Sequence, residues 1–402
     1  MRVDMVQRAG LLALPLLVLA VHAQDRVSAQ ELVLRVGETM GALEYTFGFV
    51  ADVAFGPDST IYVLDGMNAE VRVFDLDGKH LRTFGRKGQG PGEFQLPNRL
   101  AVSDEYVRVN DPPQGRIVWF TLDGQHVETS RSPGAELGLT AVLPLRHGIW
   151  LGAKDSRITT HGVEPLIGGS RAYVARHGAA FRASNALVVG TFRQDALQFD
   201  TIFQYDHGSI MYLMPGRGFG FFGPRWGSGG GWGVAGDTLV LLVDAFQGEI
   251  RSLAVTEGGL IPRGNLQLPI TPEPLSEREW RAVERVERLE RDLSPGLHLV
   301  GPPFRAQLGG PIVTESGEVW VRRLHTDPTQ QSQPSESTYF VVRLDHGSYE
   351  ERELPTGFTL RAGKGDLLLG VRRTELGVFY VEVWRTGGGA GRTPSESTES
   401  PW

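Results

Sequence analysis

Residues 61–78 read IYVLDGMNAEVRVFDLDG, and this stretch decides the fold. A short apolar run ends in an aspartate at position 65, and a second apolar run at 71–74 leads to an Asp-Gly pair at 77–78. Short runs rich in β-branched and aromatic residues are typical of strands, and Asp-Gly is a strong signal for a hairpin turn. The stretch therefore predicts strand, loop, strand and hairpin.

The same pattern returns 46 residues further along the chain. Residues 107–124 read VRVNDPPQGRIVWFTLDG, with an aspartate after the first run and an Asp-Gly pair after the second. A third copy runs from LVLLVD at 239–244 to IRSL at 250–253, and a looser fourth copy from EVWV at 318–321 to FVVRLDHG at 340–347. Recurrence at a fixed period indicates a repeat architecture.

Further short strands are expected on either side of these pairs, at Val50–Phe55, Arg99–Val102 and His80–Phe84. Four strands in about 40–45 residues make up one blade of a β-propeller. The composition agrees, because 52 glycines among 402 residues are about 13 %, against ~7 % in an average protein, and each blade needs several turns. This glycine content, together with 24 prolines, excludes a helical protein.

A more specific signal lies at residues 84–97, which read FGRKGQGPGEFQLP. The phrase Gly-x-Gly-Pro-Gly-Glu-Phe resembles the connector between blades in NHL-type six-bladed propellers. The layout of the whole chain resembles exported bacterial six-bladed β-propellers of the NHL-repeat-like and TolB-like type. The resemblance implies an all-β fold of six four-stranded antiparallel blades. We expect the blades near 50–95, 96–137, 138–200, 217–270, 304–355 and 357–386.

The last of these segments supplies only three strands, whereas the apolar stretch at 32–36 has no blade of its own. We expect the two to complete each other, so that a single propeller domain spans 31–386. Such closure removes the exposed edges of an open sheet. In a chain without cysteine, this pairing must hold the first and last blades together in place of a disulfide.

Other segments fall outside the repeat. A Ser-x-x-Glu capping box and apolar residues three or four apart predict a helix at 276–293, and residues 387–402 read as a disordered tail. Residues 1–23 read as a signal peptide, with eleven apolar residues at 11–21 and cleavage after Ala23 or after Ala29. The alternative is an uncleaved N-terminal anchor. Both place the folded part outside the cytoplasm, in the periplasm or the extracellular space.

Charge narrows the range of partners. Forty basic and 47 acidic residues give a net charge of −7, which offers no electrostatic footprint for nucleic acid or an anionic membrane. The absence of cysteine excludes disulfides, thiolate metal sites and a cysteine nucleophile. We expect a monomer without a membrane span after signal cleavage, whose partner is a protein, a peptide or a glycan.

Candidate binding residues lie at strand ends that a propeller brings toward its axis. Asp65, Asp111, Asp155 and Asp244 each follow a predicted second strand. Four such carboxylates can bind a cation such as Ca²⁺ or supply acid–base pairs. An aspartate repeated at the same place in several blades can instead cap its own loop by accepting backbone N–H groups, and we favour this structural role.

Asp52, Asn98, Arg99, His147 and His325 also lie near predicted strand ends, and no spacing singles them out. We count all of these except His147 as candidates to line the axial funnel. The sequence has no zinc-binding histidine motif, no Gly-x-Ser-x-Gly elbow and no Gly-Lys-Ser/Thr end to its glycine-rich stretches.

Catalytic residues are therefore not assigned, and we expect no cofactor. We predict a binding module that uses its axial funnel. The alternative is a metal-dependent hydrolase or lyase, similar to lactonases or streptogramin lyases, with a divalent ion such as Ca²⁺ at the axis.

Overall fold

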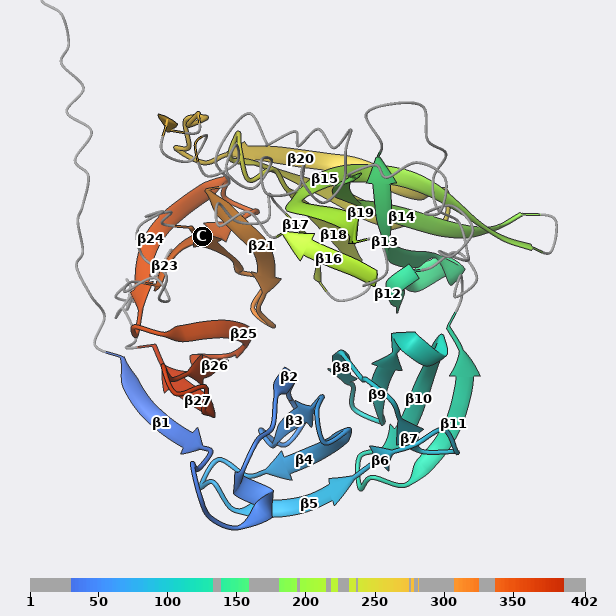
Figure 1. Ribbon diagram of the computed structural model, residues 1–402. Helices are drawn as coiled ribbons and strands as arrows, with labels where there is room; N and C mark the ends of the chain where they lie inside the picture. Colours follow the sequence, from blue (N-terminus) through green and yellow to red (C-terminus); the bar gives the residue numbers. More distant parts are fainter. Residues whose placement is uncertain are drawn as a thin grey trace, which may run out of the picture.

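The structure is a computed structural model, drawn in Figure 1. It describes residues 30–132, 139–158, 181–193, 196–214, 218–222, 231–235, 238–274, 276–277, 281, 307–324 and 337–386. The predicted signal peptide, the predicted tail and His325 lie outside these residues, as does most of the predicted helix. Of that helix, Glu277 and Arg281 are described as helical, and their side chains form an ion pair of 3.2 Å. Among the described residues, no helix is long and apolar enough to cross a membrane.

In the part of the chain that the structure describes, six antiparallel sheets of four or five strands are arranged around a central axis (Figure 1), so the fold is a β-propeller. The first blade contains β2 (Val50–Phe55), β3 (Ile61–Asp65), β4 (Glu70–Phe74) and β5 (His80–Phe84). The second contains β8 (Arg99–Val102), β9 (Tyr106–Asp111), β10 (Arg116–Thr121) and β11 (His126–Arg131). In each blade the strand order follows the chain from the axis outward. The strand pairs predicted from the repeat are present in both blades.

The third blade differs from the prediction of four strands. It contains β12 (Leu139–Pro144), β13 (Trp150–Ile158), β14 (Phe181–Arg193), β15 (Ala196–Met214) and β16 (Gly218–Phe222). The long hairpin of β14 and β15 replaces the short Asp-Gly hairpin of the first two blades, so pairing continues further along the chain. For this reason β16 belongs to the third blade, although residues from 217 onward were assigned to the fourth.

The fourth and fifth blades return to four strands. The fourth contains β17 (Gly231–Ala235), β18 (Leu239–Val243), β19 (Glu249–Thr256) and β20 (Gly259–Gln267). The fifth contains β21 (Leu308–Val313), β22 (Val319–Arg323), β23 (Ser337–Arg343) and β24 (Ser348–Leu354).

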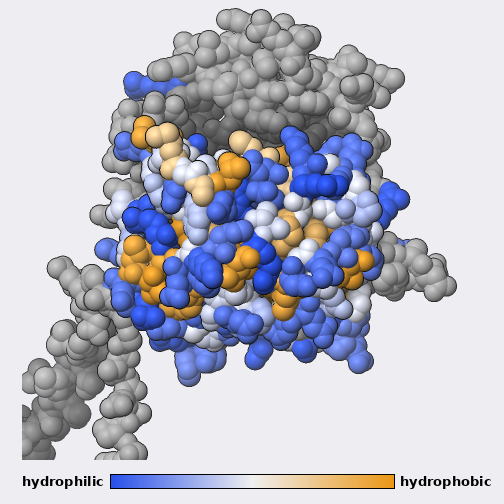
Figure 2. All heavy atoms as spheres, turned by 90° about the horizontal axis from the view of Figure 1, so that it is seen from below, coloured by the Kyte–Doolittle hydropathy of each residue, from blue (hydrophilic) through white to orange (hydrophobic). Residues whose placement is uncertain are grey.

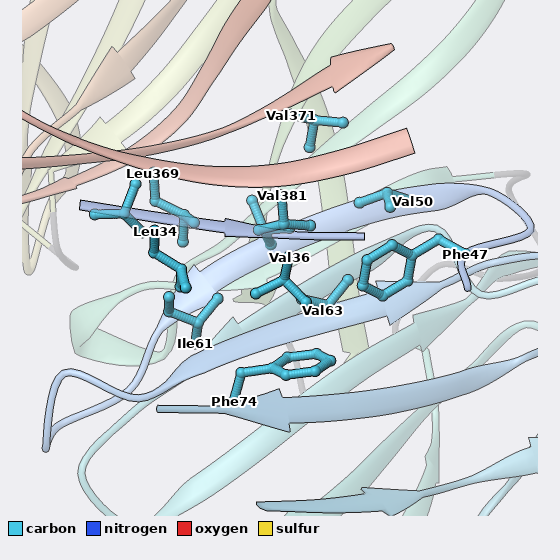
Figure 3. Close-up of a cluster of buried hydrophobic side chains, with 12 residues drawn as sticks. Leu34, Val36, Phe47, Val50, Ile61, Val63, Phe74, Leu369, Val371 and Val381 are labelled. Atoms are coloured by element: carbon cyan, nitrogen blue, oxygen red, sulfur yellow. The ribbon is translucent and has the colours of Figure 1, made fainter. Parts of the chain in front are cut away.

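The sixth blade joins the two ends of the described chain. The strands β25 (Phe358–Lys364), β26 (Leu367–Arg373) and β27 (Phe379–Arg385) are completed by β1 (Glu31–Val36), which pairs antiparallel with β27. Leu34 and Val36 of β1 are buried in a cluster with residues of the first and last blades (Figure 3). The buried carboxylate of Glu382, on β27, forms ion pairs with Arg35 of β1 and Arg372 of β26. Each arginine Nε lies 2.8 Å from Glu382 Oε1. The ring is thus closed by strand pairing, apolar packing and a shared charge.

The hydrophobic core lies between adjacent blades. Tyr62, Leu64 and Val71 of the first blade pack in one buried cluster with Val107 and Val109 of the second. Comparable clusters join the third blade to the fourth, the fourth to the fifth, the fifth to the sixth and the sixth to the first. Hydrophilic side chains predominate on the outer wall seen from below, with hydrophobic groups between them (Figure 2). Stacking therefore buries the sheet faces between these neighbouring blades, as in other repeat proteins.

The glycine-rich connector between the first two blades is organised by one side chain. Glu93 accepts hydrogen bonds from the backbone N–H of Gly90 at 2.8 Å and from Arg86 Nε at 2.7 Å. These two donors lower the pKa of Glu93. A short parallel pairing of β6 (Arg86–Lys87) with β7 (Glu93–Phe94) holds the connector, and Phe94 is fully buried. Glycine-rich loops can bind phosphate through their backbone N–H groups, but in this connector a phosphate would have to displace the carboxylate of Glu93.

Candidate functional site

The innermost strand of several blades contains a register shift near its start. The shift lies between Val50 and Asp52 in β2, between Leu308 and Pro311 in β21 and between Leu360 and Ala362 in β25. β12 has a comparable shift in the third blade. Such bulges turn a side chain out of the regular alternation and occur often beside functional sites. Asp52 and Arg361 lie at two of these shifts.

Asp52 is the buried carboxylate at this level, and it joins two blades. One of its oxygens accepts the backbone N–H of Leu100 on β8 at 3.0 Å, and the other accepts the N–H of Val53 at 3.1 Å. Arg99 Nη1 lies 4.0 Å from Asp52 Oδ2, which is an ion pair without a hydrogen bond. Asp52 is therefore a tether between the inner strands of the first and second blades.

Burial dominates the ionisation of Asp52. Desolvation raises its pKa, although Arg99, the Leu100 N–H and Arg361 act in the opposite direction. A carboxyl group whose pKa is raised binds protons more strongly in the folded than in the unfolded state. The ionised form of Asp52 therefore costs stability at neutral pH, and this cost disappears as the pH falls through its folded-state pKa.

A matching tether joins the fifth and sixth blades. The hydroxyl group of Tyr339, on β23, accepts the backbone N–H of Leu360 on β25 at 3.1 Å. Burial raises the pKa of Tyr339, against the effect of this N–H and of the positive charges on Arg322 and Arg361. In the described part of the chain, Arg322 Nε is buried without a hydrogen-bond partner. Arg361 is exposed and acts on both Asp52 and Tyr339, so it links the two tethers electrostatically.

We call these five residues the axial cluster: Asp52, Arg99, Arg322, Tyr339 and Arg361. The cluster contains three arginines and one carboxylate, and both oxygens of that carboxylate already accept backbone N–H groups. Each guanidinium carries five N–H donors in a planar fork that fits a carboxylate. The cluster can therefore bind an anionic group.

Three of the repeated aspartates accept backbone N–H groups from the loops beside them. Asp65 is fully buried and accepts the backbone N–H groups of Gly48 at 2.8 Å, Phe49 at 3.2 Å, Met67 at 3.1 Å and Asn68 at 3.1 Å. It also accepts the side-chain amide of Asn68 at 2.9 Å. The first blade thus uses this aspartate to fix both the loop before β2 and the turn after β3.

Asp111 repeats this arrangement in the second blade. It is fully buried and accepts the backbone N–H groups of Gln95 at 2.9 Å and Leu96 at 3.0 Å, together with Gln114 Nε2 at 2.8 Å. Asp244 accepts the N–H groups of Phe246 and Gln247 in the fourth blade. These contacts are those of the loop-capping role that we favoured for the repeated aspartates.

The remaining predicted site residues are more scattered. Asn98 is exposed and donates its backbone N–H to Asn110 O at 3.1 Å. Asp155 was expected to follow the second strand of its blade, but it lies within β13, which continues to Ile158 because its pairing with β14 does. His147 adopts a left-handed backbone conformation, with φ of 58°, in the turn before β13. Within the described residues, no three or more His, Asp or Glu side chains are grouped so that they could hold a metal ion.

Sequence reasoning missed Arg322, Tyr339 and Arg361. Tyr339 begins the apolar run YFVV and reads as a core residue, and the two arginines follow no spacing that the sequence repeats. Their common signal is structural: Arg361 lies at the bulge of β25, and Arg322 pairs with Tyr339 across the adjacent strands β22 and β23.

The inner strands of the fourth and fifth blades meet through glycine. A Cβ atom on Gly231 of β17 would lie 2.7 Å from Gly310 Cα on β21, and one on Gly233 would lie 2.9 Å from Pro311 O. Real Cβ atoms essentially never come that close to backbone atoms, so these two inner strands meet backbone to backbone. This contact explains part of the glycine-rich stretch before β18, which the repeat does not account for.

The chain is similar to several solved structures over most of its length. The chain has 14 % identity to a protein of Bacteroides fragilis named as predicted to be exported, with a TM-score of 0.49 and coverage of 90 % of this chain and 97 % of that one. It has 9 % identity to virginiamycin B lyase from Staphylococcus aureus, with a TM-score of 0.42 and coverage of 89 % and 99 %. It has 12 % identity to the calcium-binding protein regucalcin from Agrobacterium tumefaciens, with a TM-score of 0.41 and coverage of 89 % and 96 %.

These identities are too low to transfer an activity. A family match covers a shorter part of the chain. Residues 47–148 match a family described as a 6-bladed β-propeller. That segment covers the two most regular blades, including the connector whose glycine pattern resembles NHL-type propellers. The chain is thus a β-propeller protein, with local similarity to this six-bladed family.

Proposed function

We propose that this protein is an exported recognition module that binds a carboxylate-bearing protein, peptide or glycan at its axial cluster. One observation carries the proposal: Arg99 and Arg361 both act on a single carboxylate, Asp52, whose two oxygens already accept backbone N–H groups. The guanidinium groups therefore keep donors for an anionic ligand.

The local charge stands out from the charge of the whole chain. The protein carries a net charge of −7, yet the axial cluster contains three arginines and one carboxylate. A site of one sign on a surface of the other attracts ligands selectively, because the local field guides the encounter while the rest of the surface repels them. Export rests on the apolar N-terminal segment and belongs to the same proposal.

Titration calorimetry with two carboxylate polymers tests the proposal. Poly-L-glutamate represents a polypeptide and polygalacturonate represents a glycan. We expect at least one polymer to bind, and we expect R99Q/R361Q to weaken this binding at least tenfold. The control variant R251Q/R263Q removes the same number of charges from β19 and β20 and should retain the wild-type affinity.

Added salt supplies a second readout. Binding through the arginines should weaken as the salt concentration rises. Failure of both polymers to bind at low salt, or equal losses in R99Q/R361Q and R251Q/R263Q, would refute the proposed function.

A further inference from the structure

In two neighbouring blades, a buried aspartate holds the backbone of an exposed apolar residue just before the inner strand. Phe49 directly precedes β2, and its backbone N–H is held by Asp65; Leu96 lies before β8, and its N–H is held by Asp111. In both blades the residue just before, Gly48 or Gln95, donates its N–H to the other oxygen of the same aspartate. Phe49 is 47 % exposed and Leu96 is 60 % exposed.

These two side chains belong to a larger apolar surface. Met67 is 63 % exposed, and its backbone is held by the same Asp65 that holds Phe49. The ring of Phe49 meets the ring of Phe379 edge-on, with centroids 5.6 Å apart. A Cβ atom on Gly66 would lie 3.2 Å from both Phe49 Cδ1 and Pro97 O, so the loop of the first blade lies against the connector of the second.

We call this surface the apolar rim and define it as Phe49, Met67, Leu96 and Phe379. It spans the sixth, first and second blades on the face where their inner strands begin. Arg99 lies three residues after Leu96, and Arg361 lies within the inner strand of the sixth blade. The arginines are therefore set into the inner strands, while the apolar side chains stand on the loops around them.

We propose that the apolar rim docks a polypeptide segment of a partner in which acidic residues alternate with large apolar ones. This proposal rests on the proposed function, because the acidic residues are those that Arg99 and Arg361 bind. Charge complementarity selects the carboxylates, and the exposed apolar side chains select their neighbours. Buried aspartates fix the loops beforehand, so binding does not have to order them.

The arrangement fits a polypeptide better than a bilayer or a glycan. A protein that binds an anionic bilayer carries its cations around the inserted apolar groups, whereas here the cations lie on the inner strands and the apolar groups on the loops outside them. The net charge of −7 also repels an anionic bilayer. Leucine offers no hydrogen bonds to the hydroxyl groups of a sugar, and methionine offers only a weak acceptor.

Fluorescence anisotropy with three labelled twelve-residue peptides and the full chain tests this inference. One peptide alternates Glu with Leu, the second alternates Glu with Ser and the third alternates Gln with Leu. We expect the Glu-Leu peptide to bind at least tenfold more tightly than either of the others. The variant F49S/L96S should lose most of this advantage, while I261S, which removes an exposed apolar side chain from β20, should retain it.

The same measurements distinguish misfolding of the variant from failure of the apolar rim and from failure of the proposed function. Equal melting temperatures of F49S/L96S and the wild type show that the loops still fold. Equal binding of the Glu-Leu and Glu-Ser peptides would refute the apolar rim as a docking site but leave the proposed function standing. Failure of both acidic peptides, with poly-L-glutamate and polygalacturonate also unbound, would refute both. Cosedimentation with phosphatidylglycerol vesicles that F49S/L96S abolishes would replace the polypeptide with a bilayer.

Discussion

Asp65 shows how much one side chain contributes to this fold. Its two oxygens accept four backbone N–H groups and one amide from two different loops, and Arg72 Nη2 lies 3.6 Å away. Asparagine has nearly the same shape, but it has one acceptor oxygen and places a donor where the second oxygen was. A donor would then face the backbone N–H groups of the loop.

We therefore predict that D65N lowers the free energy of unfolding by about 3 kcal/mol, the scale of breaking a buried charged network. The matched control is D75N in the same blade. Asp75 accepts the N–H groups of Asp77 and Lys79 on a single oxygen, so asparagine can keep both bonds, and we expect a loss below about 0.5 kcal/mol. Urea denaturation of both variants measures the difference, and equal losses would contradict the role of Asp65.

The repeat in the sequence pointed to Asp65, Asp111 and Asp244, which cap loops, because the same residue at the same place in successive blades meets the same backbone. It also included Asp155, which lies within a strand of the irregular third blade. It could not indicate the axial cluster. Arg322 and Arg361 follow no repeated spacing; Arg322 lies beside Tyr339 through the pairing of β22 and β23, and Arg361 through the packing of the sixth blade against the fifth. Residues that make up a recognition site differ from blade to blade, so a repeat pattern hides them.

At the scale of elements, glycine decides how closely inner strands approach. Gly231 and Gly310 bring β17 and β21 together without side chains between them, whereas β2 and β8 are joined by Asp52. Neighbouring inner strands are consequently joined in different ways, by a close backbone contact between the fourth and fifth blades and by a buried carboxylate between the first and second. The sequence showed the excess of glycine at this place but not which strand the glycines would meet.

We predict that G231A destabilises the protein by about 1–3 kcal/mol, the usual cost of overpacking, because the new methyl group would overlap Gly310. The matched control is G264A on β20. A Cβ atom there has Ser252 Oγ at 3.7 Å as its nearest neighbour and needs no unusual backbone angle, so the change should be neutral or slightly stabilising. Thermal unfolding compares the two, and equal melting temperatures would show that β17 can move away from β21 without cost.

The number and length of the strands in the third blade could not be predicted from the sequence. Short hairpins with Asp-Gly turns make the first two blades recognisable, since each turn gives the end of one strand and the start of the next. The third blade lacks this turn, and its pairing continues through β14 and β15 to β16. Without a turn residue to end a strand, the sequence sets neither the strand length nor the strand number.

At the scale of the whole molecule, the ring depends on one short strand from the beginning of the described chain. β1 is the outer strand of the sixth blade, and Leu34 and Val36 fill the cluster between that blade and the first. Lys364 adds a second connection, because its Nζ donates to Gly56 O at 2.9 Å and Pro57 O at 3.0 Å. The sequence anticipated a strand at this place because an apolar stretch without a blade and a blade without a fourth strand can satisfy each other.

We predict that a chain beginning at Gly37 loses stability and recovers it when residues 30–36 are supplied as a free peptide. Without β1, the edge of β27 is unpaired and the carboxylate of Glu382 loses Arg35. A peptide present at a hundred times its dissociation constant stabilises the folded state by about 2.7 kcal/mol, which raises the melting temperature by roughly 5 °C in a chain of this size. The control peptide replaces Leu34 and Val36 with aspartate, because both side chains are buried. Equal effects of the two peptides, or an unchanged melting temperature in the shortened chain, would show that the ring is held closed by the contacts of Lys364 and the first blade, without β1.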